Sequence, residues 1–400
     1  MEFIALLSMM MALGALSIDM MLPAFGEMRE SFGLAADSNR VAGVVTSFLL
    51  GLALAQVFYG PLADSLGRKP MLYVGYGLFA AGAIGAALAP SLGLVFAGRV
   101  AWGAGAAGPR VIALTIVRDR YEGRQMARVM SYVMAIFVLV PITAPGLGAL
   151  VIAVAPWRWV FWFCVLAVCV LAVWSIRLPE TLKPEYRLPL RWDRLLQAAR
   201  IVLTTRITLG YTLAMVFAFG AFLSYLASSE IIFSDVFDLE DEFPFIFGGV
   251  AALMGAAMLL NSRIVEKVGP RRLVHTVQVG YVTAAGGLLV LALATGGTPP
   301  FWVFLAFLAT MLVCHALLLP NINAVAMDPV GAVAGTASAL IGTISTAGGA
   351  VLGLLLDRAF DGTVLPHAVG FLIYGAIGLG IVAVTERGRL FVDREAQVTA

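Results

Sequence analysis

The sequence predicts an all-α integral membrane protein of about twelve transmembrane helices, arranged as two similar six-helix bundles. Three observations predict this class: an apolar composition, repeated apolar runs of membrane-spanning length, and a sequence repeat that relates the two halves of the chain. Of the 400 residues, 61% are hydrophobic and 12% are charged, and the mean hydropathy is +0.95. Because soluble domains carry about a quarter charged residues, we expect lipid to cover much of this apolar surface.

Apolar runs long enough to cross a bilayer occur six times in each half of the chain. A hydrocarbon core about 30 Å thick needs roughly 20 helical residues. The expected spans are residues 3–25, 42–63, 70–89, 92–116, 129–153 and 157–177, followed by 207–233, 244–265, 272–294, 300–321, 331–356 and 365–385. The first run has no basic segment before it, so we expect a retained helix and not a cleaved signal peptide.

These spans define the expected domains. They are an N-terminal six-helix bundle of residues 1–178, a cytoplasmic linker of residues 179–206, a C-terminal six-helix bundle of residues 207–386 and a cytoplasmic tail of residues 387–400. The linker ends in the basic, amphipathic sequence RWDRLLQAARIVL. This sequence fits either an interfacial helix on acidic lipid or a solvated basic segment.

The distribution of basic residues predicts that both termini are cytoplasmic. With the N-terminus inside, the inward loops and ends hold twenty lysines and arginines, whereas the outward loops hold only four, Arg29, Arg40, Arg158 and Arg358. Cytoplasmic loops of membrane proteins carry such an excess of positive charge. We therefore expect a multi-pass protein of a bacterial-type inner (plasma) membrane.

A short motif occurs once in each half of the chain, in the same orientation. Residues 60–70 are GPLADSLGRKP and residues 262–272 are SRIVEKVGPRR. Asp64 corresponds to Glu266 and Gly67 to Gly269, at an offset of 202 residues. Each copy places an acid at a helix end, a glycine turn and a basic cluster. A repeat in this orientation predicts two similar halves related by an axis along the membrane normal.

Several of these segments resemble motifs of a known family. GPLADSLGRKP is similar to the signature loop of the major facilitator superfamily, and Arg99 in GRVAWGAGAAG resembles its fourth-helix arginine motif. SIDMMLPAF, IVRDRYEG, VPITAPGLGAL and VAGTASALIG resemble segments of the Bcr/CflA group of drug-resistance exporters. Two positions differ, because Trp102 stands where the arginine motif usually has glutamine, and Gly148-Ala149 replaces a pair of glycines.

The resemblance implies the major facilitator fold and a drug:proton antiporter. Such a protein exports small amphipathic compounds in exchange for protons by alternating access, with the proton gradient as its energy source and no cofactor. The implied partners are a small-molecule substrate, protons and membrane lipids. We expect a monomer that binds neither nucleic acid nor metal. A metabolite importer or exchanger stays open, whereas a membrane-embedded enzyme is disfavoured because the chain has no HExxH or Walker sequence.

Charged residues inside the spans are the candidates for the mechanism, because each costs about 2.5–3.5 kcal/mol at membrane depth. Asp19 and Arg99 have similar expected depths, about 10 and 12 Å below the outer surface. Arg110 falls on the same face of its span as Arg99. We expect these three residues in the substrate cavity, with Asp19 as the proton carrier and Arg99 as its electrostatic partner.

Alternatives remain for three acidic or basic residues of the spans. The alternative for Asp19 is to pair helices through a polar contact. The alternative for Arg110 is to extend its side chain to the inner surface. Glu230 lies near the expected outer end of its span, so we expect a solvated interfacial acid there. Whether Glu230 takes part in proton coupling stays open.

The motif loop is the candidate gate. By resemblance, Asp64 and Arg68 would form, with Arg118, a contact between the halves that breaks during transport, and Gly67 would supply the turn. Simple anchoring by positive charge is the alternative, and it explains Arg68 but neither the acid nor the glycine.

The fifth span contains the candidate hinge. Pro141, Pro145 and Gly146 lie within one and a half turns of each other. Proline frees a backbone carbonyl group and glycine permits close approach of a neighbouring helix. The segment therefore fits either a hinge or a closely packed helix.

Overall fold

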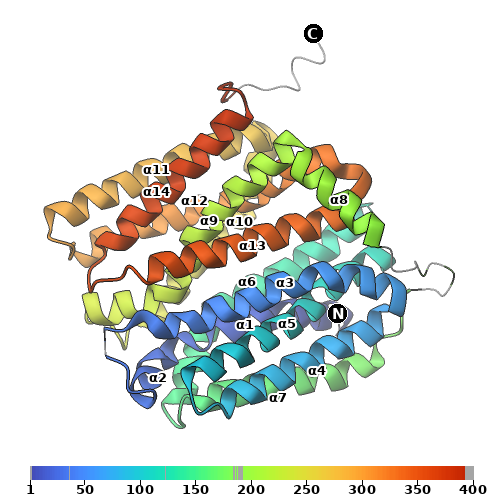
Figure 1. The fold of residues 1–400 in the computed structure, drawn as a ribbon, viewed down its shortest axis with the longest axis horizontal. Helices are drawn as coiled ribbons and strands as arrows, with labels where there is room; N and C mark the ends of the chain where they lie inside the picture. Colours follow the sequence, from blue (N-terminus) through green and yellow to red (C-terminus); the bar gives the residue numbers. More distant parts are fainter. Residues whose placement is uncertain are drawn as a thin grey trace. The chain divides into compact units, whose positions relative to one another are not determined.

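The computed structural model of this protein describes residues 2–35, 37–121, 123–182, 185, 187 and 192–391. Within these residues every regular element is a helix (Figure 1). The chain forms two compact units. Residues Met1–Trp192 with Asp241–Gly249 make up the first unit, and Asp193–Glu240 with Val250–Ala400 make up the second. Parts of the expected linker and most of the expected tail lie outside the described residues.

The first unit contains the helices of the first half of the chain. Their bounds are α1 Glu2–Asp19, η1 Leu22–Ala24, α2 Phe25–Ser31, η2 Asn39–Ala42, α3 Gly43–Leu66, α4 Arg68–Ala87, α5 Leu92–Arg120, α6 Gly123–Ile152, α7 Arg158–Trp174 and η3 Ser175–Arg177.

The second unit contains the remaining helices, except that the first residues of α10 group with the first unit. Their bounds are α8 Trp192–Thr204, α9 Arg206–Ile231, the π-helix η5 Ile232–Val236, α10 Phe243–Val268, α11 Pro270–Ala294, α12 Phe301–Met327, η6 Asp328–Val333, α13 Ala334–Asp357 and α14 Leu365–Thr385. The amphipathic end of the linker therefore forms a helix of its own, α8.

The helical spans agree with the apolar runs of the sequence. Among the described residues, eleven helical segments are long and apolar enough to cross a membrane, and α6 contributes a shorter apolar stretch, Leu139–Ile152. With α6 included, the predicted set of six plus six helices is confirmed. Two spans are longer than expected. The first continues through η1 and α2 to Ser31, and the seventh continues through η5 to Val236.

Several matching pairs of helices pack together in both units. In the first unit, α1 packs against α5, α6 and α7, and α4 packs against α5 and α7. In the second unit, α9 packs against α12, α13 and α14, and α11 packs against α12 and α14. The two sets coincide when α1 is matched to α9 and α4 to α11. The internal repeat predicted from the sequence is therefore a repeat of helix packing.

The repeated motif forms the same turn in each unit. Gly67 connects α3 to α4 with φ = 112°, and Gly269 connects α10 to α11 with φ = 79°. Residues with a Cβ atom rarely adopt these backbone angles, so both turns favour glycine. This explains why the glycine recurs at the same position of the repeat.

Candidate functional site

Arg99 lies in the middle of the first unit and is fully buried. Its Nε donates a hydrogen bond to the carbonyl oxygen of Val44 on α3, at 3.1 Å, and its Nη1 donates to the carbonyl oxygen of Ser17 on α1, also at 3.1 Å. The guanidinium carbon lies 4.5 Å from the ring centres of both Phe48 and Trp102. Arg99 therefore connects α1, α3 and α5 through backbone carbonyls and cation–π contacts.

The carbonyl of Ser17 is available to Arg99 because α1 ends there. In a regular helix the amide of Met21 would donate to this carbonyl. Here the amide of Met21 donates to Ile18 instead, at 3.4 Å, and η1 follows. Pro23 lies in η1 and has no N–H group to continue the helix ladder. A cation at the carbonyl end of a helix also interacts favourably with its dipole.

Asp19 is the last residue of α1 and is 4% exposed. It lies two residues beyond Ser17, whose carbonyl Arg99 contacts. This position is consistent with the similar depths that the sequence predicted for the acid and the arginine. However, no ion pair or hydrogen bond joins Asp19 to Arg99 among the described residues, as the arginine is held by carbonyls. The expected partnership is therefore not a direct contact in this conformation.

Arg110 has a different environment from Arg99. Arg110 is exposed, whereas Arg99 is fully buried. In this conformation the two arginines therefore do not share one exposed face of α5, and the place of Arg99 in a substrate cavity stays a prediction.

Close packing of α5 against its neighbours holds Arg99 in place. A Cβ atom on Gly103 would lie 1.9 Å from the carbonyl oxygen of Phe48 on α3. A Cβ atom on Gly105 would lie 2.1 Å from the amide nitrogen of Phe79 on α4. The glycines of the arginine motif thus let α3 and α4 approach α5 closely, and α3 supplies Val44 and Phe48 to the guanidinium group.

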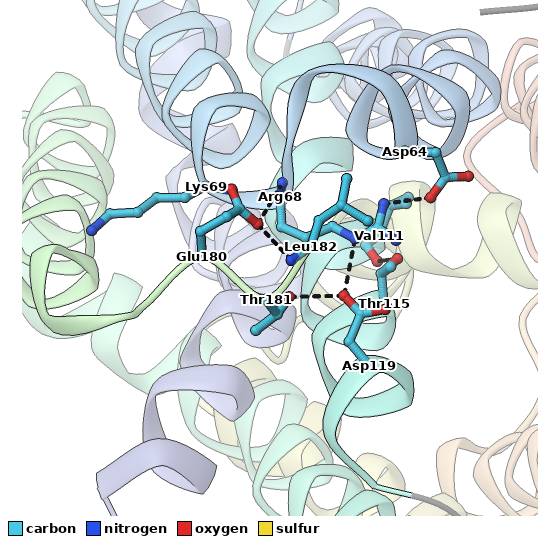
Figure 2. A network of polar contacts seen from close by, with 9 residues as sticks. All are labelled: Asp64, Arg68, Lys69, Val111, Thr115, Asp119, Glu180, Thr181 and Leu182. Atoms are coloured by element: carbon cyan, nitrogen blue, oxygen red, sulfur yellow. Dashed lines mark hydrogen bonds and ion pairs between the residues drawn. The ribbon is translucent and has the colours of Figure 1, made fainter. Parts of the chain in front are cut away.

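A second polar site surrounds the turn between α3 and α4 (Figure 2). The buried Arg68 side chain is bonded to two carboxylates, through Nη1 to Asp64 and through Nε to Asp119 at 3.0 Å. Thr181 donates its hydroxyl hydrogen to the same oxygen of Asp119, at 2.8 Å. The motif loop, the end of α5 and the start of the linker therefore meet in one network.

Glu180 attaches the start of the linker to the first turn of α4. Its carboxylate accepts hydrogen bonds from the amides of Arg68 and Lys69, at 3.1 and 3.0 Å, and from the amide of Leu182 at 3.0 Å. These α4 amides have no partner within the helix, and a negative charge is favourable at a helix N-terminus. A Cβ atom on Gly67 would lie 2.8 Å from a carboxylate oxygen of Glu180. Close contact with Glu180 is therefore a second reason, besides the backbone angle, why this position favours glycine.

Arg118 is not part of this network among the described residues. Its side chain is exposed, and its neighbour Asp119 contacts Arg68 instead. The sequence analysis missed both Asp119 and Glu180. Each acid lies close to basic residues in the sequence, which could have marked it as a partner for a cation. However, Asp119 is 51 residues and Glu180 is 112 residues away from Arg68. Only the folded chain identifies such partners.

The fifth span, α6, remains one helix through Pro141 and Pro145. A Cβ atom on Gly146 would meet nothing within 4 Å, whereas one on Gly148 would lie 1.9 Å from the carbonyl oxygen of Met20. The close approach between α6 and the end of α1 therefore depends on Gly148 and not on Gly146.

Glu230 corrects another expectation from the sequence. It is 3% exposed and not a solvated acid. The seventh span extends to Val236, beyond the end at residue 233 that the apolar run suggested. Glu230 therefore lies inside the helical span and not at its surface.

A profile of the Major Facilitator Superfamily matches residues 4–354 of this chain. The chain belongs to the Major Facilitator Superfamily. It is therefore a membrane transporter of small molecules and not an enzyme.

Two of three curated relatives of this facilitator are named as drug-resistance proteins. It is 29% identical over 366 residues to a bicyclomycin resistance protein homolog of Haemophilus influenzae, which covers 91% of each chain. It is 27% identical to the MFS-type transporter YdgK of Bacillus subtilis, over 93% of this chain and 92% of that one. It is 30% identical to the multidrug resistance protein MdtL of Escherichia coli, over 61% of this chain and 62% of that one.

Solved structures of other facilitators share the fold. A D-xylose–proton symporter aligns with a TM-score of 0.78 at 14% identity, over 98% of both chains. The human organic anion transporter MFSD10 aligns with a TM-score of 0.67 at 20% identity, over 96% of this chain and 99% of that one. At these identities the likeness concerns the fold.

Proposed function

We propose that this facilitator exports small amphipathic compounds, drugs or metabolites, in exchange for protons. The observation that carries the proposal is its similarity, over nine-tenths of both chains, to a bicyclomycin resistance protein homolog. Another relative, MdtL, is a multidrug resistance protein. A buried acid within a span, Asp19, supplies a group able to carry a proton.

In this proposal Asp19 is the proton carrier of the first unit. Burial and a nearby cation act in opposite directions on the proton affinity of a carboxyl group. A conformational change that moves the guanidinium of Arg99 relative to Asp19 would therefore change whether the acid keeps its proton. Each proton that enters at 100 mV supplies about 2.3 kcal/mol from the electrical potential. Arg99 and the exposed Arg110 would contribute to the substrate cavity.

The turn between α3 and α4 would act as the inner gate. The charged network of Arg68, with Asp64 and Asp119, supports this role because its bonds are able to break and re-form. Asp64→Asn should leave membrane insertion intact but change the accessibility of cysteines introduced on the cytoplasmic side. Wild-type accessibility together with wild-type transport would remove Asp64 from the gate. Gly67 would hold the turn, and Arg118 would contribute charge to this surface.

Movement within the first unit would involve the proline segment of α6. Pro141 and Pro145 leave carbonyl groups without their usual donors. Gly146 has open space beside it, so it supports a bend and not tight packing.

For topology, we propose that both termini and the linker lie in the cytoplasm of a bacterial-type inner membrane, and that the transporter acts as a monomer. Reporter fusions after Pro90 and after Asp241 should then read periplasmic, and a fusion at the C-terminus should read cytoplasmic. A periplasmic C-terminus would contradict the arrangement.

Expression of the protein in an efflux-deficient bacterium tests the proposed activity. We expect resistance to at least one compound of a panel that includes bicyclomycin, with lower accumulation inside the cells. The matched control is Asp19→Asn at equal abundance in the membrane, which should give no resistance. Increased sensitivity or accumulation would instead indicate import.

A further inference from the structure

The second unit contains a buried acid that the activity proposed above does not use. Asp357 is the last residue of α13 and is 2% exposed. The expected eleventh span ended at residue 356, so the sequence placed this acid just outside the membrane. In the structure it is the terminal residue of the Gly335–Asp357 span.

Two serine hydroxyls of α9 hold the Asp357 side chain. Ser224 donates to Oδ1 at 2.6 Å and Ser228 donates to the same oxygen at 2.9 Å. The two serines are four residues apart, so they lie one above the other on the same face of α9. Both are fully buried. Two neutral donors therefore bind one oxygen of the acid, and all three side chains are buried.

Two glycines of α13 allow this helix to pack closely against α9. A Cβ atom on Gly353 would lie 3.2 Å from the amide nitrogen of Ser224, and one on Gly349 would lie 2.5 Å from the Cβ atom of Phe219. The close approach places the end of α13 directly on the serine face of α9. The geometry is thus set by the helix backbones, and it does not depend on flexible side chains.

Other ionisable groups of the second unit, among the described residues, lie on α9, α12 and α14 and in the segment after α13. On α9, Glu230 is also buried. On α14, the hydroxyl of Tyr374 donates to the carbonyl of Leu352 at 2.8 Å. The His367 ring on α14 lies against Phe360 and Phe371.

Two charged residues follow α13, and one histidine lies on α12. Arg358, the next residue after Asp357, is exposed. Asp361 accepts hydrogen bonds from the amide and hydroxyl of Thr363, at 3.0 and 2.7 Å. His315 of α12 stacks on Phe222, with ring centres 4.5 Å apart.

We propose that Asp357 is a proton-binding site of the second unit. The carboxylate binds one proton at Oδ2, while Oδ1 continues to accept the two serine hydroxyls. A serine hydroxyl donates equally to a carboxylate and to the carbonyl oxygen of a carboxylic acid, which allows both protonation states in one geometry. Use of this proton in transport would rest on the proposed proton-driven export, whereas its binding does not.

Infrared spectroscopy of the protein reconstituted in phosphatidylcholine vesicles tests the site without any substrate. The difference spectrum between acidic and alkaline buffer reports the C=O stretching bands of carboxyl groups that gain a proton. We expect Asp357→Asn to lose one such band. Asparagine keeps an oxygen that accepts from both serines, so this variant preserves the link between α13 and α9.

Two further variants assign the band. The double variant Ser224→Ala, Ser228→Ala should keep it but move it to higher frequency, because the carbonyl oxygen loses two hydrogen bonds. Asp19→Asn should leave it in place. A difference spectrum of Asp357→Asn identical to that of the wild type would overturn the proposal, as would an unmoved band in the double serine variant. Because the assay contains no drug, a failure of export leaves its result standing.

Discussion

The turn between α3 and α4 and the turn between α10 and α11 have the same backbone but different side-chain contacts. Both have a glycine with positive φ. In the first unit, Arg68 is buried between two carboxylates, and Glu180 binds the amides that begin α4. In the second unit, Arg271 pairs with Asp328 at 3.2 Å, and the aspartate side chain is 69% exposed. The repeat therefore preserved the fold of the turn, whereas the buried network is a property of the first unit.

Removal of the arginine from each turn should give the largest difference. Arg68→Ala leaves two partly exposed carboxylates without their cation, so we expect a cost between the roughly 1 kcal/mol of an exposed pair and the roughly 3 kcal/mol of a buried one. Arg271→Ala removes an exposed pair worth less than about 1 kcal/mol. We expect a clearly lower thermal unfolding midpoint for Arg68→Ala alone. Equal shifts for the two variants would mean that the networks are equivalent.

Replacement of the two turn glycines should separate backbone strain from side-chain contact. Gly67→Ala and Gly269→Ala each force alanine into a region that costs of order 1–3 kcal/mol. Only at Gly67 does the new Cβ atom also displace Glu180, since a Cβ atom on Gly269 would meet nothing within 4 Å. We expect Gly67→Ala to be the less stable variant by about 1 kcal/mol, the worth of a hydrogen bond. Chemical unfolding of both purified variants measures the difference, and a larger loss for Gly269→Ala would refute it.

The smallest effect is expected from neutralising the carboxylate at the start of α4. Glu180→Gln keeps an acceptor oxygen but loses the charge that favours a helix N-terminus, worth about 0.3–1 kcal/mol. Glu266→Gln is the matched control, because this exposed acid of the second turn has no hydrogen bond among the described residues. Thermal unfolding should separate the two variants slightly, and more so at low salt. No separation at low salt would show that the charge of Glu180 adds nothing to its hydrogen bonds.

The sequence was sufficient to predict the helices and the repeat, because a span in lipid must satisfy its own backbone groups and this rule is local. Contacts between helices were harder to predict. The sequence placed Arg99 level with Asp19, but the break near Pro23 directs the guanidinium to the Ser17 carbonyl instead. Glu230 was assigned to the surface because the π-helical extension of its span has no signature in an apolar run.

The contacts of Asp357 and Glu180 were also difficult to predict from the sequence. Asp357 follows the last apolar residue of its span, so a hydropathy window excludes it, although the paired serines on α9 place it inside the bundle. Glu180 binds amides 111 and 112 residues away. In both cases the partner belongs to a distant helix, and its proximity is decided by packing of the whole unit.

Proton-driven export through Asp19 is the central claim, and transport by proteoliposomes under an imposed pH gradient tests it most directly. The substrate is a compound to which the expressed protein confers resistance, and counterflow exchange without a gradient is the internal control. We predict that the wild-type protein concentrates the compound against its gradient. Asp19→Asn should keep counterflow but lose this uphill transport. Uphill transport by Asp19→Asn at the wild-type level would contradict the account.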